Sequence, residues 1–386
     1  MAVIDLADER SRAIRAVLVG APKRDTAELE GLVATLGYEI VRVVSLARLE
    51  ENPVYGLGKG KAAEIASLAT ALAADIIIFD FELSPRKQRN WEQLAKLPVI
   101  DRQEVILRIF ASRAQTKEAV LQVQLARLEY SLPRLAHSYG DMARQRGGNF
   151  GAKGSGETQL ELDSRKVRER IAQVKRELSQ VVRSRDTQRR RRERFSLPVC
   201  ALAGYTNAGK SSLLYALTGA AVRIEDKLFA TLDPTTRKLR LAPPLAVGAS
   251  DEGAYTPPAT VLLTDTVGFI SNLPHSLINA FHSTLEAVQR ARLILLVLDA
   301  SAPCVESQYA TVVSVLEEIG ASHTPRMVVL NKTDMLSSDT SQLIRLRALF
   351  PDAVAVSAKT RAGFDELLAR IYGALRPPAT AAADFA

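Results

Sequence analysis

One eight-residue stretch constrains this 386-residue chain more than any other feature. It matches the phosphate-loop spacing G-x-x-x-x-G-K-[ST] and reads Gly204-Tyr205-Thr206-Asn207-Ala208-Gly209-Lys210-Ser211. An apolar run over 197–203 predicts a short buried strand before it, and residues from Ser212 onward predict the first turns of a helix. In such a unit the glycines let successive N–H groups point at one anion, Lys210 binds phosphate and the Ser211 hydroxyl ligates Mg²⁺. The stretch therefore predicts a nucleotide site on an α/β sheet.

Three further motifs follow in chain order, each after a predicted apolar strand. They are Asp265-Thr266-Val267-Gly268, Asn331-Lys332-Thr333-Asp334 and Ser357-Ala358-Lys359. We expect Asp265 to hold Mg²⁺ through water and Gly268 to offer its N–H to the γ-phosphate. The Asp334 carboxylate can accept the N1 and 2-amino hydrogens of guanine, a donor pair that adenine lacks, and the third motif places a backbone N–H near guanine O6. Together the motifs predict a GTP-binding domain on an open α/β sheet.

The segment between the phosphate loop and Asp265 contains a candidate switch loop, which reads Phe229-Ala230-Thr231-Leu232-Asp233-Pro234-Thr235-Thr236. A switch loop needs a threonine whose hydroxyl reaches Mg²⁺ in the triphosphate state. Thr231, Thr235 and Thr236 are all candidates, and the residues themselves do not choose among them.

The residue after Gly268 bears on hydrolysis. Many GTPases carry a glutamine there to orient the attacking water, whereas this chain carries Phe269, which has no donor or acceptor. We therefore expect slow intrinsic hydrolysis that rises when a large partner binds. We interpret His275 and His282 as packing or surface residues rather than bases. Asn207 raises a less favoured alternative, a mechanism assisted by K⁺ bound at the phosphate loop.

The N-terminal part of the chain predicts a second α/β domain, over residues 1–102. Predicted strands over 15–20, 38–46, 75–80 and 98–100 alternate with helices over 25–36, over 61–73 and from Pro85 onward. This alternation indicates a small parallel sheet covered by helices. The Gly-Lys run over 56–61 is interpreted as a flexible turn with first-turn lysines rather than as a second phosphate site.

Residues 103–195 predict a long antiparallel helical hairpin. The periodicity predicts one helix over 103–132 that Pro133 limits, a glycine-rich stretch over 147–156 and a second helix over 157–194. Between Ser131 and Phe195 there are 17 Lys and Arg against 8 Asp and Glu, so this segment carries the entire basic excess of a chain whose net charge is +8. We expect it to contact RNA phosphates and shape rather than stacked bases, and we expect no DNA partner. A solvated charged helix is the alternative for its terminal arginine run.

Composition and termini exclude several other classes of protein. Two cysteines, Cys200 and Cys304, are too few for a disulfide framework or a zinc cluster. The first residues lack a basic and then apolar leader, and no apolar run approaches the length of a membrane span. We expect a cytoplasmic monomer without integral membrane association. The GTP-binding domain is expected over 196–376, with a flexible tail over 377–386.

At this point the chain resembles a known family, the HflX GTPases. The resemblance covers nearly the whole chain and rests on the stretch from Gly147 to Glu161, on the run from Phe229 to Thr235 and on Asp265-Thr266-Val267-Gly268-Phe269-Ile270. It implies a GTPase that uses Mg²⁺, binds the large ribosomal subunit and its RNA, and helps to split or rescue stalled ribosomes. It also implies that Thr231 is the switch threonine and a Mg²⁺ ligand, and that Lys210, Thr231 and Gly268 carry catalysis. Some members have an extra C-terminal domain, whereas only a short Ala/Pro-rich tail follows Leu375 here.

Two other functions compete with this one. A small-molecule phosphotransferase is disfavoured because the Asn331–Asp334 motif is present and no lid-like arginine cluster follows the phosphate loop. A ribosome-assembly scaffold, in which the nucleotide is regulatory or structural, remains the second hypothesis.

Overall fold

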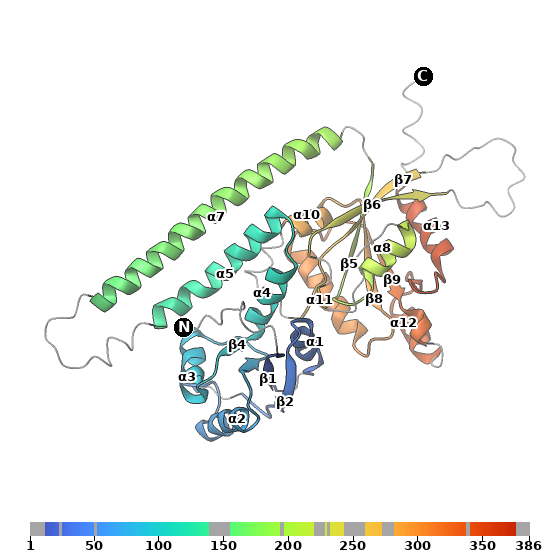
Figure 1. Ribbon diagram of the computed structural model, residues 1–386. Helices are drawn as coiled ribbons and strands as arrows, with labels where there is room; N and C mark the ends of the chain where they lie inside the picture. The colour runs from blue at the N-terminus through green and yellow to red at the C-terminus, as the bar shows by residue number, and fades with distance from the viewer. Residues whose placement is uncertain are drawn as a thin grey trace, which may run out of the picture. The chain divides into compact units, whose positions relative to one another are not determined.

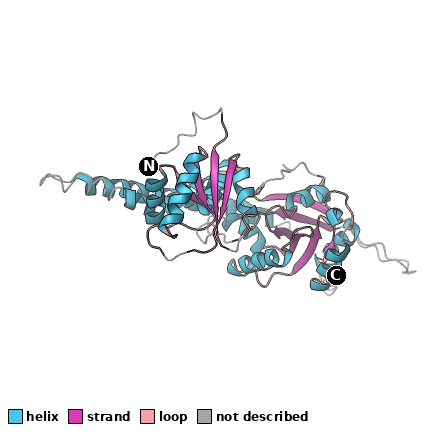
Figure 2. Ribbon diagram, turned by 90° about the horizontal axis from the view of Figure 1, so that it is seen from below, coloured by secondary structure: helices cyan, strands magenta, loops and turns pink. Residues whose placement is uncertain are grey.

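The computed structural model describes ten segments of the chain: residues 12–22, 25–49, 52–138, 155–193, 197–219, 228–229, 232–242, 259–271, 282–336 and 340–375. The chain divides into two compact units, Met1–Arg183 and Ser184–Ala386. Each unit contains one sheet with helices packed on it (Figure 1; Figure 2). None of the described helices is long and apolar enough to cross a membrane.

The first unit begins with a four-stranded parallel sheet in the order β2-β1-β3-β4. Its strands are β1 (Arg15–Gly20), β2 (Glu39–Ser45), β3 (Ile76–Phe79) and β4 (Val99–Asp101), and its connections are α1 (Ala27–Thr35), α2 (Lys59–Ala71) and α3 (Pro85–Ala95). Val17 and Val19 pack with Phe79 and Trp91 in one apolar cluster that includes α2 and α3. Because side chains alternate along a strand, their neighbours point to the opposite face. The predicted parallel α/β sheet is confirmed.

The helical part of the first unit corrects one expectation. A single helix over 103–132 is wrong, because α4 (Arg102–Arg113) and α5 (Lys117–Ser138) are separate helices. Ala114 takes an extended conformation, and the Thr116 hydroxyl oxygen accepts a hydrogen bond from the Ala119 N–H at 3.2 Å, as a helix cap does. Pro133 lies inside α5 instead of limiting it. Proline has no N–H to donate within the helix. The next residue, Arg134, adds a side-chain hydrogen bond here, because its guanidinium donates to the Tyr130 carbonyl at 2.9 Å.

A 39-residue helix, α7 (Ser155–Glu193), follows α5 and runs beside it in the opposite direction (Figure 1). Contacts between the helices include a hydrogen bond from Arg170 to Gln124 at 3.4 Å and an ion pair in which the Lys175 amine lies 2.8 Å from the Glu129 carboxylate. Val174 is fully buried whereas Arg168, Lys175 and Arg176 are exposed, so this part of the helix has a buried and an exposed face. Most of the predicted glycine-rich stretch, residues 147–154, lies outside the described residues.

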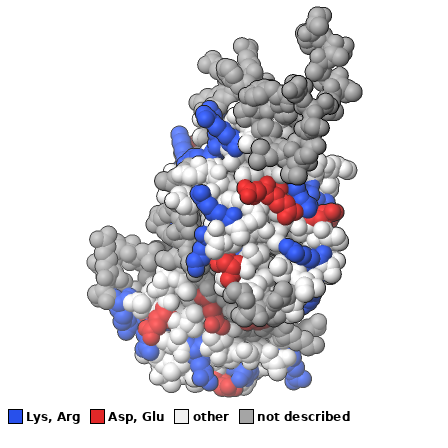
Figure 3. All heavy atoms as spheres, turned by 90° about the vertical axis from the view of Figure 1, so that its right-hand side faces the viewer, with Lys and Arg blue, Asp and Glu red and all other residues white. Residues whose placement is uncertain are grey.

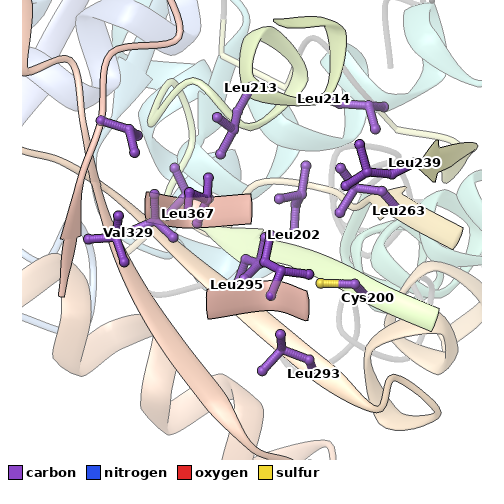
Figure 4. Packing of buried hydrophobic residues seen from close by; sticks show 14 of the residues in the cluster. Cys200, Leu202, Leu213, Leu214, Leu239, Leu263, Leu293, Leu295, Val329 and Leu367 are labelled. Carbon is purple, nitrogen blue, oxygen red and sulfur yellow. The ribbon is translucent and has the colours of Figure 1, made fainter. Parts of the chain in front are cut away.

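The second unit is built on a six-stranded sheet in the order β10-β9-β8-β5-β7-β6, parallel except for the antiparallel pair β6 and β7. Its strands are β5 (Val199–Gly204), β6 (Thr235–Leu241), β7 (Ala259–Asp265), β8 (Leu293–Asp299), β9 (Arg326–Asn331) and β10 (Val354–Ala355). Its helices are α8 (Lys210–Thr218), α10 (His282–Gln289), α11 (Val305–Glu318), η1 (Thr333–Leu336), α12 (Thr340–Leu349) and α13 (Phe364–Leu375). Leu213 of α8 and Leu367 of α13 belong to the core that covers Leu202 and Leu295 of the sheet (Figure 4). This core fixes the start of α8 at the carboxyl end of β5.

Candidate functional site

The phosphate loop joins the end of β5 to the start of α8. Gly209 has φ +86°, and a Cβ atom there would lie 2.3 Å from the Asn331 side-chain nitrogen, so no other residue fits without displacement. The Lys210 amine donates to the carbonyl oxygens of Gly204 at 3.1 Å and Tyr205 at 2.8 Å. The lysine side chain therefore lies folded back over its own loop, with its amine beside Gly204 and Tyr205.

Burial changes the ionisation of this lysine. Desolvation lowers the pKa of the Lys210 amine from 10.5 to about 8, and the nearby Asp265 carboxylate partly opposes this shift. A buried cation with a lowered pKa gains from a bound anion, because the anion restores the stabilisation that water would give. The loop thus favours a polyphosphate.

The two predicted Mg²⁺ groups that the structure describes lie together. The Ser211 hydroxyl donates to a carboxylate oxygen of Asp265 at 2.6 Å, although the two residues come from different elements. A hydroxyl and a carboxylate fit a hard cation that takes oxygen ligands and completes its shell with phosphate and water. These residues would therefore hold Mg²⁺, which neutralises phosphate charge when bound. Thr231, the other side chain predicted to ligate Mg²⁺ directly, lies outside the described residues, as does Ala230.

The Asp265–Gly268 motif is attached directly to the phosphate loop. The Thr206 N–H donates to the Phe269 carbonyl at 2.8 Å, and the Phe269 N–H donates to the Gly204 carbonyl at 3.1 Å. A Cβ atom at Gly268 would lie 2.8 Å from Thr206 Cα and 3.0 Å from the Lys210 nitrogen. Gly268 therefore lies against Thr206 and Lys210 of the phosphate loop, a position compatible with its predicted contact to a γ-phosphate.

The side chains around Phe269 add a second attachment. Phe269 is 1% exposed, and its ring therefore offers no group to solvent in this arrangement. The Tyr205 hydroxyl lies 2.7 Å from the Ser271 hydroxyl and accepts the Ser271 N–H at 2.8 Å. The segment from Phe269 to Ser271 is thus bonded to the phosphate loop at both of its ends.

The predicted guanine-binding motifs are also joined to the loop. The Asn331 amide donates to the Ala208 carbonyl at 2.9 Å, and its oxygen accepts the Ala358 N–H at 3.0 Å. The Ser357 hydroxyl donates to the Asp334 carboxylate at 2.7 Å. Three segments distant in sequence therefore meet at the carboxyl ends of β5 and β9, with Asp334 held by one hydroxyl and able to accept from a base.

Other predicted residues fall in several places. Thr235 and Thr236 lie in β6, where the Thr236 hydroxyl is 3.0 Å from that of Thr264. Phe229 and Leu232 are buried. Among the other predicted residues, Ala208, Thr266 and Val267 are buried, and Asn207 and Lys359 are exposed. The remaining three, Ser212, Asp233 and Thr333, are partly buried.

The structure adds two residues that the sequence reasoning missed. Asp299, at the end of β8, forms a 2.7 Å ion pair with Lys332 and so orients the second residue of the guanine motif. The sequence contains a pattern that indicates Asp299: the apolar run over 293–298 is followed by this carboxylate, as an apolar strand is followed by Asp265. Ser271, which bonds to Tyr205, had no comparable signal, since its role depends on a contact between two loops.

Comparison with known families assigns each region of the chain. Residues 23–111 match a family model described as GTP-binding GTPase N-terminal, residues 113–192 match GTP-binding GTPase Middle Region, and residues 199–332 match 50S ribosome-binding GTPase. A solved structure described as a complex of SsGBP and GDP is 24% identical, with a TM-score of 0.52, and covers 93% of this chain and 98% of its own. That likeness supports the fold.

Relatives with a curated name agree with these models. GTPase HflX of Caldanaerobacter subterraneus subsp. tengcongensis is 41% identical over 369 residues, which are 95% of this chain and 81% of the relative. GTPase HflX of Escherichia coli is 42% identical over 343 residues, covering 89% and 77%. That of Akkermansia muciniphila is 47% identical over 319 residues, covering 81% and 70%. The chain therefore belongs to the HflX family of GTPases, and it is a GTP-binding GTP hydrolase of the ribosome-binding class.

Proposed function

We propose that this protein binds the large ribosomal subunit in its GTP state and couples GTP hydrolysis to the splitting, rescue or recycling of ribosomes. The observation that carries the proposal is the attachment of Gly268 and Phe269 to the phosphate loop beside Lys210. A γ-phosphate at Lys210 must lie against this segment, so the segment can respond to the difference between GTP and GDP.

The roles of the site residues follow from their positions. Lys210 and the loop N–H groups bind the phosphates, Ser211 and Asp265 hold Mg²⁺, and Asp334 selects guanine. Thr231 is proposed as the switch ligand of Mg²⁺. Hydrolysis assisted by K⁺ bound near Asn207 is an alternative, which a comparison of GTP turnover in potassium and sodium salts tests.

Helix α7 supports contact with RNA. Its exposed basic side chains include Arg165, Lys166, Arg168 and Arg176, and phosphate contacts from such groups position a protein on nucleic acid without reading bases. On the face of the molecule that Figure 3 shows, by contrast, the described basic and acidic side chains are interspersed. The localised charge of the helical segment favours a single polyanionic partner.

Co-sedimentation with isolated ribosomal subunits tests the proposal. We expect binding to the large subunit with a non-hydrolysable GTP analogue, weaker binding with GDP, and a steep loss of binding as salt rises. Incubation of intact ribosomes with the protein and the analogue should increase free subunits in a sucrose gradient. Equal binding with both nucleotides would favour the assembly-scaffold alternative and contradict the switch.

Two matched double variants distinguish an effect of the overall net charge on ribosome binding from an effect of the basic side chains of α7. Arg165→Glu with Arg168→Glu should abolish the nucleotide-dependent binding, because both residues are exposed on α7. Arg86→Glu with Arg347→Glu changes the net charge equally at exposed sites elsewhere and should leave binding intact. Equal losses in the two pairs would contradict a role for α7.

A further inference from the structure

The phosphate loop contains a buried hydroxyl with no visible use. Thr206 is 7% exposed, and its hydroxyl oxygen is buried without a hydrogen-bond partner among the described residues. A buried polar group without a partner costs about 1–3 kcal/mol, and a valine of the same shape would avoid that cost. Such a group in the middle of a binding loop points to a ligand that completes it.

The surroundings of Thr206 identify which part of the nucleotide lies near it. Its Cα and Cγ2 atoms would lie 2.8 and 2.9 Å from a Cβ atom at Gly268, and the Lys210 nitrogen would lie 3.0 Å from that same atom. Both Gly268 and Lys210 are proposed γ-phosphate contacts. Thr206 therefore borders the γ-phosphoryl end of the site, away from the base.

The same place lacks the group that orients water in many GTPases. The residue after Gly268 is Phe269, which is buried and carries no donor or acceptor. The Thr206 N–H is already bonded to the Phe269 carbonyl at 2.8 Å, so the side-chain hydroxyl is the donor that Thr206 can still offer to a water.

We propose that the Thr206 hydroxyl is a catalytic group that orients the water attacking the γ-phosphorus of GTP, a role that rests on the proposed site. The water oxygen forms a bond to the γ-phosphorus as the bond to the β–γ bridging oxygen breaks. GDP leaves with that electron pair, and the proton of the water passes to an oxygen of the released phosphate. The hydroxyl contributes orientation and consumes no proton.

Two substitutions of Thr206 test this role. Thr206→Val keeps the shape and removes the hydroxyl, so kcat for GTP should fall roughly 10- to 100-fold while KM and the GDP dissociation constant change less than about twofold. Thr206→Ser retains the hydroxyl and should restore kcat to within about threefold of the parent. The nucleotide-free Thr206→Val protein should unfold at the same temperature as the parent or higher, because an unpartnered buried hydroxyl has been removed.

Thr264→Val is the matched control. Thr264 is also buried, but its hydroxyl lies 3.0 Å from that of Thr236, so its loss should lower the unfolding temperature and leave kcat unchanged. An unchanged kcat in Thr206→Val would overturn the proposal. So would a loss confined to GTP affinity, which would indicate a ground-state phosphate contact, or a lower unfolding temperature in Thr206→Val. If the parent protein failed to bind GDP, the proposed site itself would fail instead.

Discussion

The carboxyl edges of the two sheets have the same architecture and different chemistry. In both units parallel strands end in polar residues, and ligands of open α/β sheets bind at that edge. In the first unit Asp80 follows β3 and Asp101 ends β4; in the second, Asp265 and Asn331 end β7 and β9. The sequence pattern of an apolar strand followed by a carboxylate or amide is therefore common to both, and it does not by itself distinguish a site from a structural edge.

In the first unit the Asp101 carboxylate is satisfied by its neighbours. Asp101 accepts the N–H groups of Leu83 and Glu104, both at 3.1 Å, the Tyr130 hydroxyl at 2.9 Å and the Arg134 guanidinium at 3.2 Å. Burial raises the pKa of Asp101 although the two backbone bonds and Arg134 lower it. Such a network ties α5 to the sheet and leaves its central carboxylate little capacity for a ligand.

The second edge differs from Asp101 at Lys210 and Thr206, although Ser211 donates to Asp265 and Ser357 donates to Asp334 there. Lys210 donates only to carbonyl oxygens of its own loop among the described contacts, and the Thr206 hydroxyl has no partner among the described residues. Gly209 and Gly268 have no side chain, so no Cβ atom crowds Asn331, Thr206 or Lys210. The difference between the fully bonded Asp101 carboxylate and the Thr206 hydroxyl, which has no partner among the described residues, therefore says more about a ligand than the presence of polar residues at a sheet edge does.

The largest expected effect tests the structural role of the first edge. Arg134→Met removes the cation beside the buried Asp101 carboxylate and should lower the free energy of unfolding by about 3 kcal/mol. GTP turnover per folded molecule should not change. Urea unfolding followed by circular dichroism measures the first quantity, and Arg347→Met, at an exposed position, is the control. A drop in turnover at temperatures where the variant is folded would show that the edge of the first unit contributes to the site.

A smaller effect follows from the lowered pKa of Lys210 at the second edge. In the nucleotide-free protein Lys210 loses its proton above a pKa of about 8. A bound triphosphate, in contrast, favours the charged form of the amine. GTP affinity should therefore be level below pH 8 and fall about tenfold per pH unit above it, with proton uptake on binding at pH 8 to 9. Titration calorimetry in buffers of different ionisation enthalpy measures that uptake.

The same shift has an opposite consequence for stability. The unfolded chain keeps the Lys210 proton up to the ordinary pKa of 10.5, so the burial penalty is complete below pH 8 and fades as the pH rises toward 10.5. Lys210→Met should remove both pH dependences. A parent protein whose GTP affinity did not change between pH 8 and 9 would contradict the lowered pKa.

Much of the second unit could be predicted from sequence because its motifs are local. A strand, a glycine-containing turn and the first turn of a helix lie within a few residues of one another around Lys210, and each motif carries its own strand. The contacts that complete the site are not local. Neither the Tyr205–Ser271 bonds nor the Thr206 hydroxyl, which has no partner among the described residues, can be found without the position of the segment after β7.

The helical segment shows a different limit. The apolar periodicity continues through residues 103–132, so it predicts one helix, but periodicity does not record the direction of the axis. The extended Ala114 and the cap at Thr116 end one helix and start another within three residues. Pro133 wrongly predicts the end of a helix. The helix continues through it, and the contacts of Arg134 with Tyr130 and Asp101 support the helix at this point.

The smallest expected effect tests how the second edge reports the γ-phosphate. Tyr205→Phe removes the hydroxyl that bonds Ser271 and so loosens the chain just after Phe269, while the backbone bonds of Phe269 remain. One such bond stabilises by about 0.5–1.5 kcal/mol, so affinity for a GTP analogue should fall roughly threefold. GDP affinity should not change, because GDP has no γ-phosphate to meet Gly268. Stopped-flow binding of fluorescent nucleotides measures the ratio of the two affinities.

A second variant tests whether the two hydroxyls act as one contact. If they do, adding Ser271→Ala to Tyr205→Phe should weaken binding of the GTP analogue little further. Equal weakening for GDP and GTP would mean that the pair stabilises the loop as a whole and does not distinguish the nucleotides.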